Sequence, residues 1–129
     1  MLPENAVILS AKVGLCYFYT YTSVIANIGI YNVEEAWLEN SLNWNNQPDF
    51  AATAEDTTNI PAGVTDGFHY WYVTDLAQGW WDGSLTNYGV MLKDTDESTE
   101  ESWKQFYSSD WTTASQRPTL VITYYDPTS

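Results

Sequence analysis

The chain has very few cationic residues. Its 129 residues include only 4 Lys and Arg against 17 Asp and Glu, which gives a net charge of −13 at pH 7. A field of this sign repels polyanions at moderate salt. The charge therefore excludes nucleic acid, anionic lipid headgroups and polyuronic acids as direct partners, and it leaves cations and neutral ligands.

Cysteine and histidine are equally scarce. Cys16 is the only cysteine, so no disulfide forms within the chain, and its apolar surroundings in the sequence predict a buried, inert thiol. His69 is the only histidine, and its aromatic neighbours predict a packed strand residue rather than a general base. With so many acids, some pair of carboxylates always has the spacing that a glycosidase needs, so such a pair does not indicate glycosidase activity. We therefore predict a protein that is not an enzyme and needs no catalytic cofactor.

Long hydrophobic runs are also missing. No apolar segment is long enough to span a bilayer, and no charged segment followed by an apolar one opens the chain. We expect no membrane insertion. The content of 44% hydrophobic and 16% aromatic residues nevertheless supplies a core, and the length suits one domain, which we assign to residues 1–129.

Most of the chain has the pattern of short strands. Residues 7–19 alternate in polarity, with one face formed by Val7, Leu9, Ala11, Val13 and Leu15. Ile28 and Ile30 mark the inner face of a second strand over residues 25–33. Further strands are expected near Leu42 and Trp44 and over residues 68–73, 87–93, 103–108 and 118–125, with loops at 49–67 and 94–101. The pattern predicts an all-β antiparallel β-sandwich, jelly-roll-like, whose connectivity the spacing does not give.

One short helix interrupts the strands near residues 75–81. Thr74 is a candidate N-cap, and Leu76 and Trp80 lie four residues apart on one face. Gly83 suits the left-handed position that ends a helix.

Several short motifs occur in a fixed order along the chain. They are Ala11-Lys12-Val13-Gly14-Leu15, Trp37-Leu38-Glu39 with Asn43-Trp44-Asn45-Asn46-Gln47-Pro48, residues 71–80, Asn87-Tyr88-Gly89, Ser108-Ser109-Asp110 and Arg117-Pro118-Thr119-Leu120. Together they resemble the DNRLRE-type modules, also described as disaggregatase-related or carbohydrate-binding-like. Such modules recur in large secreted and cell-surface proteins of bacteria and archaea. Tyr72 departs from the pattern, which has Asp at that position.

The resemblance carries three expectations. It implies an extracellular or cell-surface location, and it places Trp37, Trp44 and Trp80 at core positions. It also implies that ~40 residues with the opening strands are missing before Leu2, a length inferred from the usual domain size. A sandwich without these strands has an open edge, which another chain or a neighbouring subunit completes by donating a strand, unless the module closes its core differently.

Aromatic residues are the strongest indication of a ligand. The chain has 7 Trp and 10 Tyr, more than its core needs, and such rings stack on sugars while polar neighbours bind the hydroxyls. We predict ligand contacts from Trp81, Trp103, Trp111 and Tyr21. Exposed aromatic rings equally mark protein interfaces. Two functions remain open: a structural or adhesive building block, which we favour, and a carbohydrate-binding module that recognises a polysaccharide.

The acidic segment at residues 94–101 offers a metal site. Asp94, Asp96 and Glu97 supply the hard oxygen ligands that Ca²⁺ prefers. The segment lacks the glycine and the spacing of a standard calcium loop. A structural Ca²⁺ here and a solvated hairpin tip without metal are the two alternatives.

Overall fold

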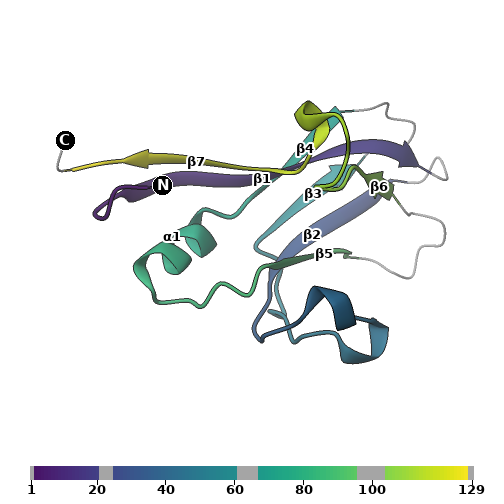
Figure 1. The fold of residues 1–129 in the computed structure, drawn as a ribbon, viewed down its shortest axis with the longest axis horizontal. Helices are drawn as coiled ribbons and strands as arrows, with labels where there is room; N and C mark the ends of the chain where they lie inside the picture. Colours follow the sequence, from purple (N-terminus) through teal and green to yellow (C-terminus); the bar gives the residue numbers. More distant parts are fainter. Residues whose placement is uncertain (1, 21–24, 61–66, 96–103, 128–129) are drawn as a thin grey trace.

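The computed structural model describes residues 2–20, 25–60, 67–95 and 104–127 (Figure 1). The strands are β1 (Val7–Thr20), β2 (Ala26–Asn32), β3 (Asp56–Ile60), β4 (Gly67–Tyr72), β5 (Val90–Asp94), β6 (Lys104–Phe106) and β7 (Thr119–Tyr125). The single α-helix of these ranges is α1 (Thr74–Asp82), and 3-10 turns occupy Glu39–Ser41, Trp44–Asn46 and Ala114–Gln116.

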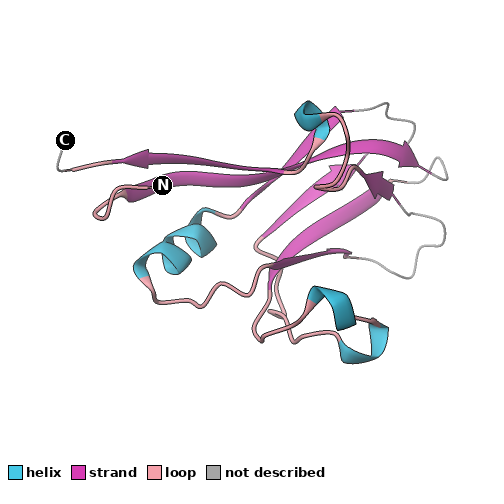
Figure 2. Cartoon of the chain, viewed as in Figure 1, coloured by secondary structure: helices cyan, strands magenta, loops and turns pink. Residues whose placement is uncertain are grey.

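The strands form two antiparallel sheets. In the first sheet β1 is central, with β4 on one edge and with β6 and β7 following each other along the opposite edge. The second sheet has the order β3-β2-β5. Figure 2 shows the strands as two layers, with α1 beside the first half of β1. The predicted all-β sandwich with one short helix is confirmed.

The core lies between the sheets and continues under α1. Its largest fully buried side chains are Trp71, Tyr17, Ile30, Ile60 and Val73. Trp71 of β4 also joins the two sheets, because its indole Nε1 donates a hydrogen bond of 2.7 Å to the carbonyl oxygen of Ile28 in β2. Cys16 is buried, as the sequence predicts.

The inner face of β1 changes parity near its start. Val7 and Leu9 were expected to face the core, but they are 46% and 59% exposed, and Ile8 is buried instead. A register shift between Ile8 and Ser10 in the pairing with β7 is the reason. Beyond the shift the predicted parity holds, since Ala11 and Tyr17 are buried.

Helix α1 extends one residue beyond the predicted range of 75–81 at each end, and Thr74 does not cap it. The N-cap is Val73, without a side-chain hydrogen bond, and the Thr74 hydroxyl instead accepts a bond of 3.2 Å from the backbone N–H of Ala11. Gln78 Oε1 accepts another from Ile8 N–H at 3.1 Å, so the helix satisfies the edge of β1 that β4 does not reach. Gly83 ends the helix at φ 84°. No helix in the described ranges has the length and apolarity needed to cross a membrane.

Two predictions for the middle of the chain are wrong. The expected strand at Leu42 and Trp44 is replaced by two 3-10 turns, because Asn43 and Asn46 form a reciprocal capping box around Trp44–Asn46. The expected loop at 49–67 contains β3, which pairs with β2. The alternating exposure of this Thr-rich strand fits a sheet, although its sequence has little apolar content.

Side chains of β3 bridge the two sheets at the edge where β3 and β4 meet. The carboxylate of Asp56 accepts a hydrogen bond of 2.8 Å from Tyr72 N–H, and the Thr58 hydroxyl donates to the carbonyl oxygen of Tyr70. These bonds satisfy backbone groups on the outer edge of β4.

Candidate functional site

The four aromatic residues predicted to bind a ligand do not form one site. Trp81 is partly buried and packs against the core, and its role as a ligand contact stays a prediction. Tyr21 and Trp103 lie outside the described residues. Trp111 is 39% exposed, in agreement with the prediction that it is accessible.

Trp111 belongs to a compact turn after β6. Its ring stacks on Tyr107 with centroids 4.6 Å apart and planes inclined by 28°. Its Nε1 donates to Gln116 Oε1 at 2.8 Å, and Arg117 Nε donates to its carbonyl oxygen at 2.6 Å. Since Tyr107 covers one face of the indole, only the other face is open to a ligand.

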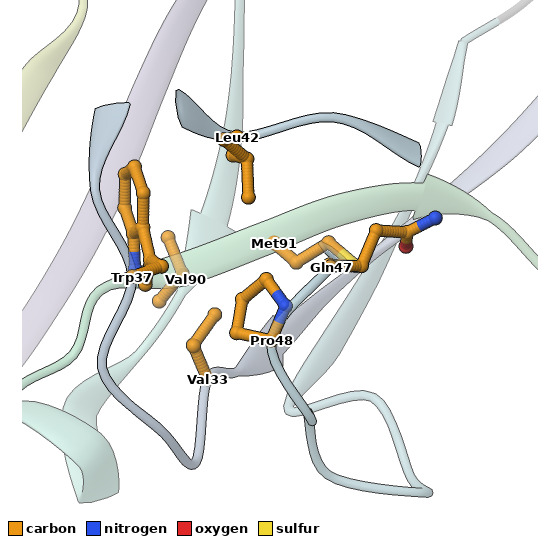
Figure 3. Close-up of a pocket in the computed structure, with 7 residues that line it drawn as sticks. All are labelled: Val33, Trp37, Leu42, Gln47, Pro48, Val90 and Met91. Atoms are coloured by element: carbon orange, nitrogen blue, oxygen red, sulfur yellow. The ribbon is translucent and has the colours of Figure 1, made fainter. Parts of the chain in front are cut away.

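A pocket of about 150 Å³ lies where the end of β2 and the start of β5 meet the segment of residues 34–48 (Figure 3). Its lining consists of Val33, Trp37, Leu42, Gln47, Pro48, Val90 and Met91. None of these side chains is charged. In Figure 3 the Trp37 indole stands on one side, and the amide of Gln47 points away from it on the other. The pocket therefore has apolar walls, an aromatic face and one amide at its rim.

Trp37 is exposed but held in a fixed orientation. The sequence placed it in the core, which is wrong, since 39% of its surface is exposed. Its Nε1 donates a hydrogen bond of 2.7 Å to the carbonyl oxygen of Tyr88. That carbonyl lies in a turn where Asn87 Oδ1 accepts from Gly89 N–H at 2.9 Å and Gly89 has φ 91°. The Asn87-Tyr88-Gly89 motif thus positions the indole.

The opposite wall of the pocket is a loop that hydrogen-bonds to itself. Asn43 N–H donates to Asn46 Oδ1 at 2.6 Å, and Asn46 Nδ2 donates to the Ser41 carbonyl at 2.7 Å. At the base of the loop Asp49 N–H donates to Glu35 Oε1 at 2.7 Å. These bonds explain the Asn-rich motif before Pro48 and fix Leu42 and Pro48 at the pocket.

An exposed indole in an uncharged pocket offers a packing surface for the apolar part of a ligand. The apolar C–H face of a sugar ring packs on an aromatic ring, while hydroxyls reach amides and water at the rim. The sequence contains no direct signal for this site, because its lining comes from two segments, residues 33–48 and residues 90–91, which only the fold brings together.

A sequence model of carbohydrate-binding module family 96 matches residues 2–124. The chain belongs to this family. No curated protein and no solved structure matches the chain. The match confirms the carbohydrate-binding part of the resemblance seen in the motifs and does not bear on the DNRLRE-type name. The family description names a binding module, in agreement with the prediction that the chain is not an enzyme.

The perturbed titratable groups of this family 96 module lie away from the pocket. His69 of β4 is half-buried with its ring edge-on to Tyr17 at 6.1 Å between centroids, and burial lowers its pKa. The pKa of Glu55 is raised, first by burial and then by repulsion from Asp75 and Asp56. Neither residue lines the pocket.

The predicted calcium site of the module stays a prediction. Asp94 is the last residue of β5 and pairs with Ile28. Asp96 and Glu97 lie outside the described residues. Within the described ranges, no three His, Cys, Asp or Glu side chains gather as a metal would need.

Proposed function

We propose that this module binds a neutral saccharide by packing one sugar ring against Trp37 in the pocket between β2, β5 and the 34–48 loop. The observation that supports the proposal is an accessible indole whose orientation is already fixed by the bond to Tyr88. A side chain held in its bound orientation loses little entropy on binding. Membership of a carbohydrate-binding family points to the same ligand class.

The charge of the chain further restricts the class of saccharide that it is expected to bind. The seven lining residues carry no charge, and the whole chain carries −13. An anionic polysaccharide would meet this field without a cation in the pocket to offset it. Neutral polysaccharides are therefore the preferred class of ligand, and an extracellular or cell-surface location, where such polymers occur, is part of the proposal.

The test compares two tryptophans. Trp37→Ala removes the indole from the pocket, whereas Trp111→Ala removes an indole with the same exposed fraction, 39%, from the turn after β6. A glycan array identifies a ligand, and isothermal titration then measures its affinity. We expect Trp37→Ala to weaken binding by about tenfold or more, the equivalent of about 1.4 kcal/mol, and Trp111→Ala to leave it unchanged.

The reverse result contradicts the proposal that the ligand binds in the pocket. Loss of binding in Trp111→Ala alone would place the ligand on the Tyr107–Trp111 stack. If neither the native chain nor the variants bind any neutral glycan on the array, the proposed function is wrong.

A structural or adhesive building block completed by a strand from another chain is the second candidate function. It is supported by a separate observation, the exposed strand β7, in which only Ile122 is partly buried. This role does not compete with sugar binding, because β7 contributes no residue to the pocket lining.

A further inference from the structure

Strand β7 is mostly uncovered. Figure 1 shows it running beside the N-terminal half of β1 toward both chain ends, and among the described strands it pairs with β1 alone. Six of its seven residues are exposed. Its outer edge thus offers backbone groups for pairing with a further strand.

The core-facing side of β7 is exposed as well. Leu120, Ile122 and Tyr124 stand opposite Val13, Ala11 and Ile8, whose side chains pack in or against the core. Residues directly opposite in an antiparallel pair point to the same face. Leu120 and Tyr124 nevertheless keep 53% and 44% of their surface exposed. These two apolar side chains lack the neighbour that the inner face of a sheet normally has.

Two other edges in the described sheets are protected. The outer edge of β4 is bridged by Asp56 and Thr58, as described above. Strand β5 carries Lys93 and Asp94, and charged residues on an edge oppose pairing with another chain. Residues 118–125, by contrast, contain no charged side chain.

We propose that β7 pairs antiparallel with β7 of a second copy of this chain, centred on Ile122. Charge argues for this occupant. Two chains of net charge −13 repel each other at most surfaces, but residues 118–125 form an uncharged seam. Arg117 precedes the seam and Asp126 follows it, so antiparallel pairing brings the Arg117 end of each copy to the Asp126 end of the other.

The register follows from the exposed apolar residues. With Ile122 opposite its own counterpart, Leu120 of each copy lies opposite Tyr124 of the other. Directly opposed side chains in such a pair have Cβ atoms about 4.5–5.5 Å apart, which is contact distance for these residues. The result is one continuous sheet in the order β1-β7-β7-β1. Because the contact is the same on both copies, it closes as a dimer.

The first measurement is the mass of the 129-residue chain in solution by size-exclusion chromatography with light scattering and by sedimentation equilibrium. The expected mass is twice the 14.7 kDa of one chain, with dissociation on dilution. A monomer at every concentration, or assemblies larger than a dimer, overturns the proposal.

A pair of double variants tests the register. Leu120→Lys with Tyr124→Lys places two ammonium groups opposite each other across the seam, and we expect a monomer. Leu120→Glu with Tyr124→Lys replaces the same two side chains but sets opposite charges across the seam, and we expect the dimer to persist. Within one chain the two positions are four strand residues, about 13 Å, apart, so both variants perturb the monomer alike.

Circular dichroism must show that both variants remain folded. If the folded variants associate equally, or if both are monomeric, the proposed register is wrong. Glycan binding is a separate readout. If the native chain binds no glycan, the proposed Trp37 site is refuted, but the proposed dimer is not affected.

Discussion

At the scale of single residues, Gly89 has the most direct effect on the candidate site. It has φ 91°, it follows the carbonyl that binds the Trp37 indole, and its own carbonyl accepts a hydrogen bond of 3.1 Å from Val33 N–H. A left-handed conformation of this kind costs an L-residue about 1–2 kcal/mol. The glycine therefore holds two walls of the pocket in place.

We predict that Gly89→Ala lowers the free energy of unfolding by about 1–2 kcal/mol and also weakens glycan binding, because relief of the strain moves the Tyr88 carbonyl. Gly83→Ala is the matched control: Gly83 has φ 84° and open space around it, but it ends α1. Urea denaturation should show similar losses for both, and titration calorimetry a binding defect for Gly89→Ala only. Equal binding by the two variants would contradict the role of this turn.

Some residue roles were accessible from the sequence and others were not. Gly83 was predicted correctly because helix termination is a local property of the backbone. The resemblance placed Trp37 at a core position, but its indole is exposed, and Trp81 is partly buried against the core. Burial of an aromatic side chain depends on which distant segment covers it, and one sequence does not contain that information.

At the scale of elements, the two sheets depend on a few side chains that join them. Trp71 is fully buried in β4, and its indole bonds to the carbonyl of Ile28 in the opposite sheet. This residue fills the space between the sheets and also fixes their relative position.

We predict that Trp71→Phe lowers the free energy of unfolding by about 2–4 kcal/mol, since it leaves a cavity and removes the hydrogen bond to the Ile28 carbonyl. Trp111→Phe, at an exposed position, should change it by no more than about 0.5 kcal/mol. Chemical denaturation followed by far-UV circular dichroism measures both. Similar stabilities for the two variants would show that the indole bond between the sheets contributes little.

The strands with strong period-two or β-branched patterns were predicted near their observed positions, and so was α1. The errors have specific causes. The register shift near Ile8 exchanged the faces at the start of β1. The polar strand β3 forms because β2 provides a partner, and the capping box of Asn43 and Asn46 favours a 3-10 turn over a strand. Each depends on pairing or on side-chain hydrogen bonds that periodicity does not report.

At the scale of the whole molecule, one residue is expected to make stability depend on pH near neutrality. His69 is the only histidine, the side chain type whose ordinary pKa lies nearest to neutral pH. Burial lowers its pKa in the folded chain, so the unfolded chain binds the proton more tightly. The stability that neutral His69 contributes is complete above its unfolded pKa of about 6.5 and is lost as the pH falls through its folded pKa.

We therefore predict that the free energy of unfolding decreases between pH 7.5 and 5.5 and that His69→Gln flattens this decrease. Glu55 acts in the opposite sense, because its raised pKa gives stability that is present at low pH and lost as the pH rises. The difference between the native chain and His69→Gln isolates the histidine. Denaturation curves at three pH values measure it, and parallel pH profiles would refute the assignment.

The sequence by itself determined the composition-level and local properties of this protein: a strongly acidic β-sandwich with one short helix ended by Gly83, and the motifs that resemble a carbohydrate-binding family. These follow from charge, periodicity and local backbone preference. The tertiary structure decided the exposure of Trp37, the pocket that it forms with residues from β2, β5 and the 34–48 loop, and the uncovered face of β7. These properties depend on contacts between segments far apart in the chain, which arise only when the sheets pack.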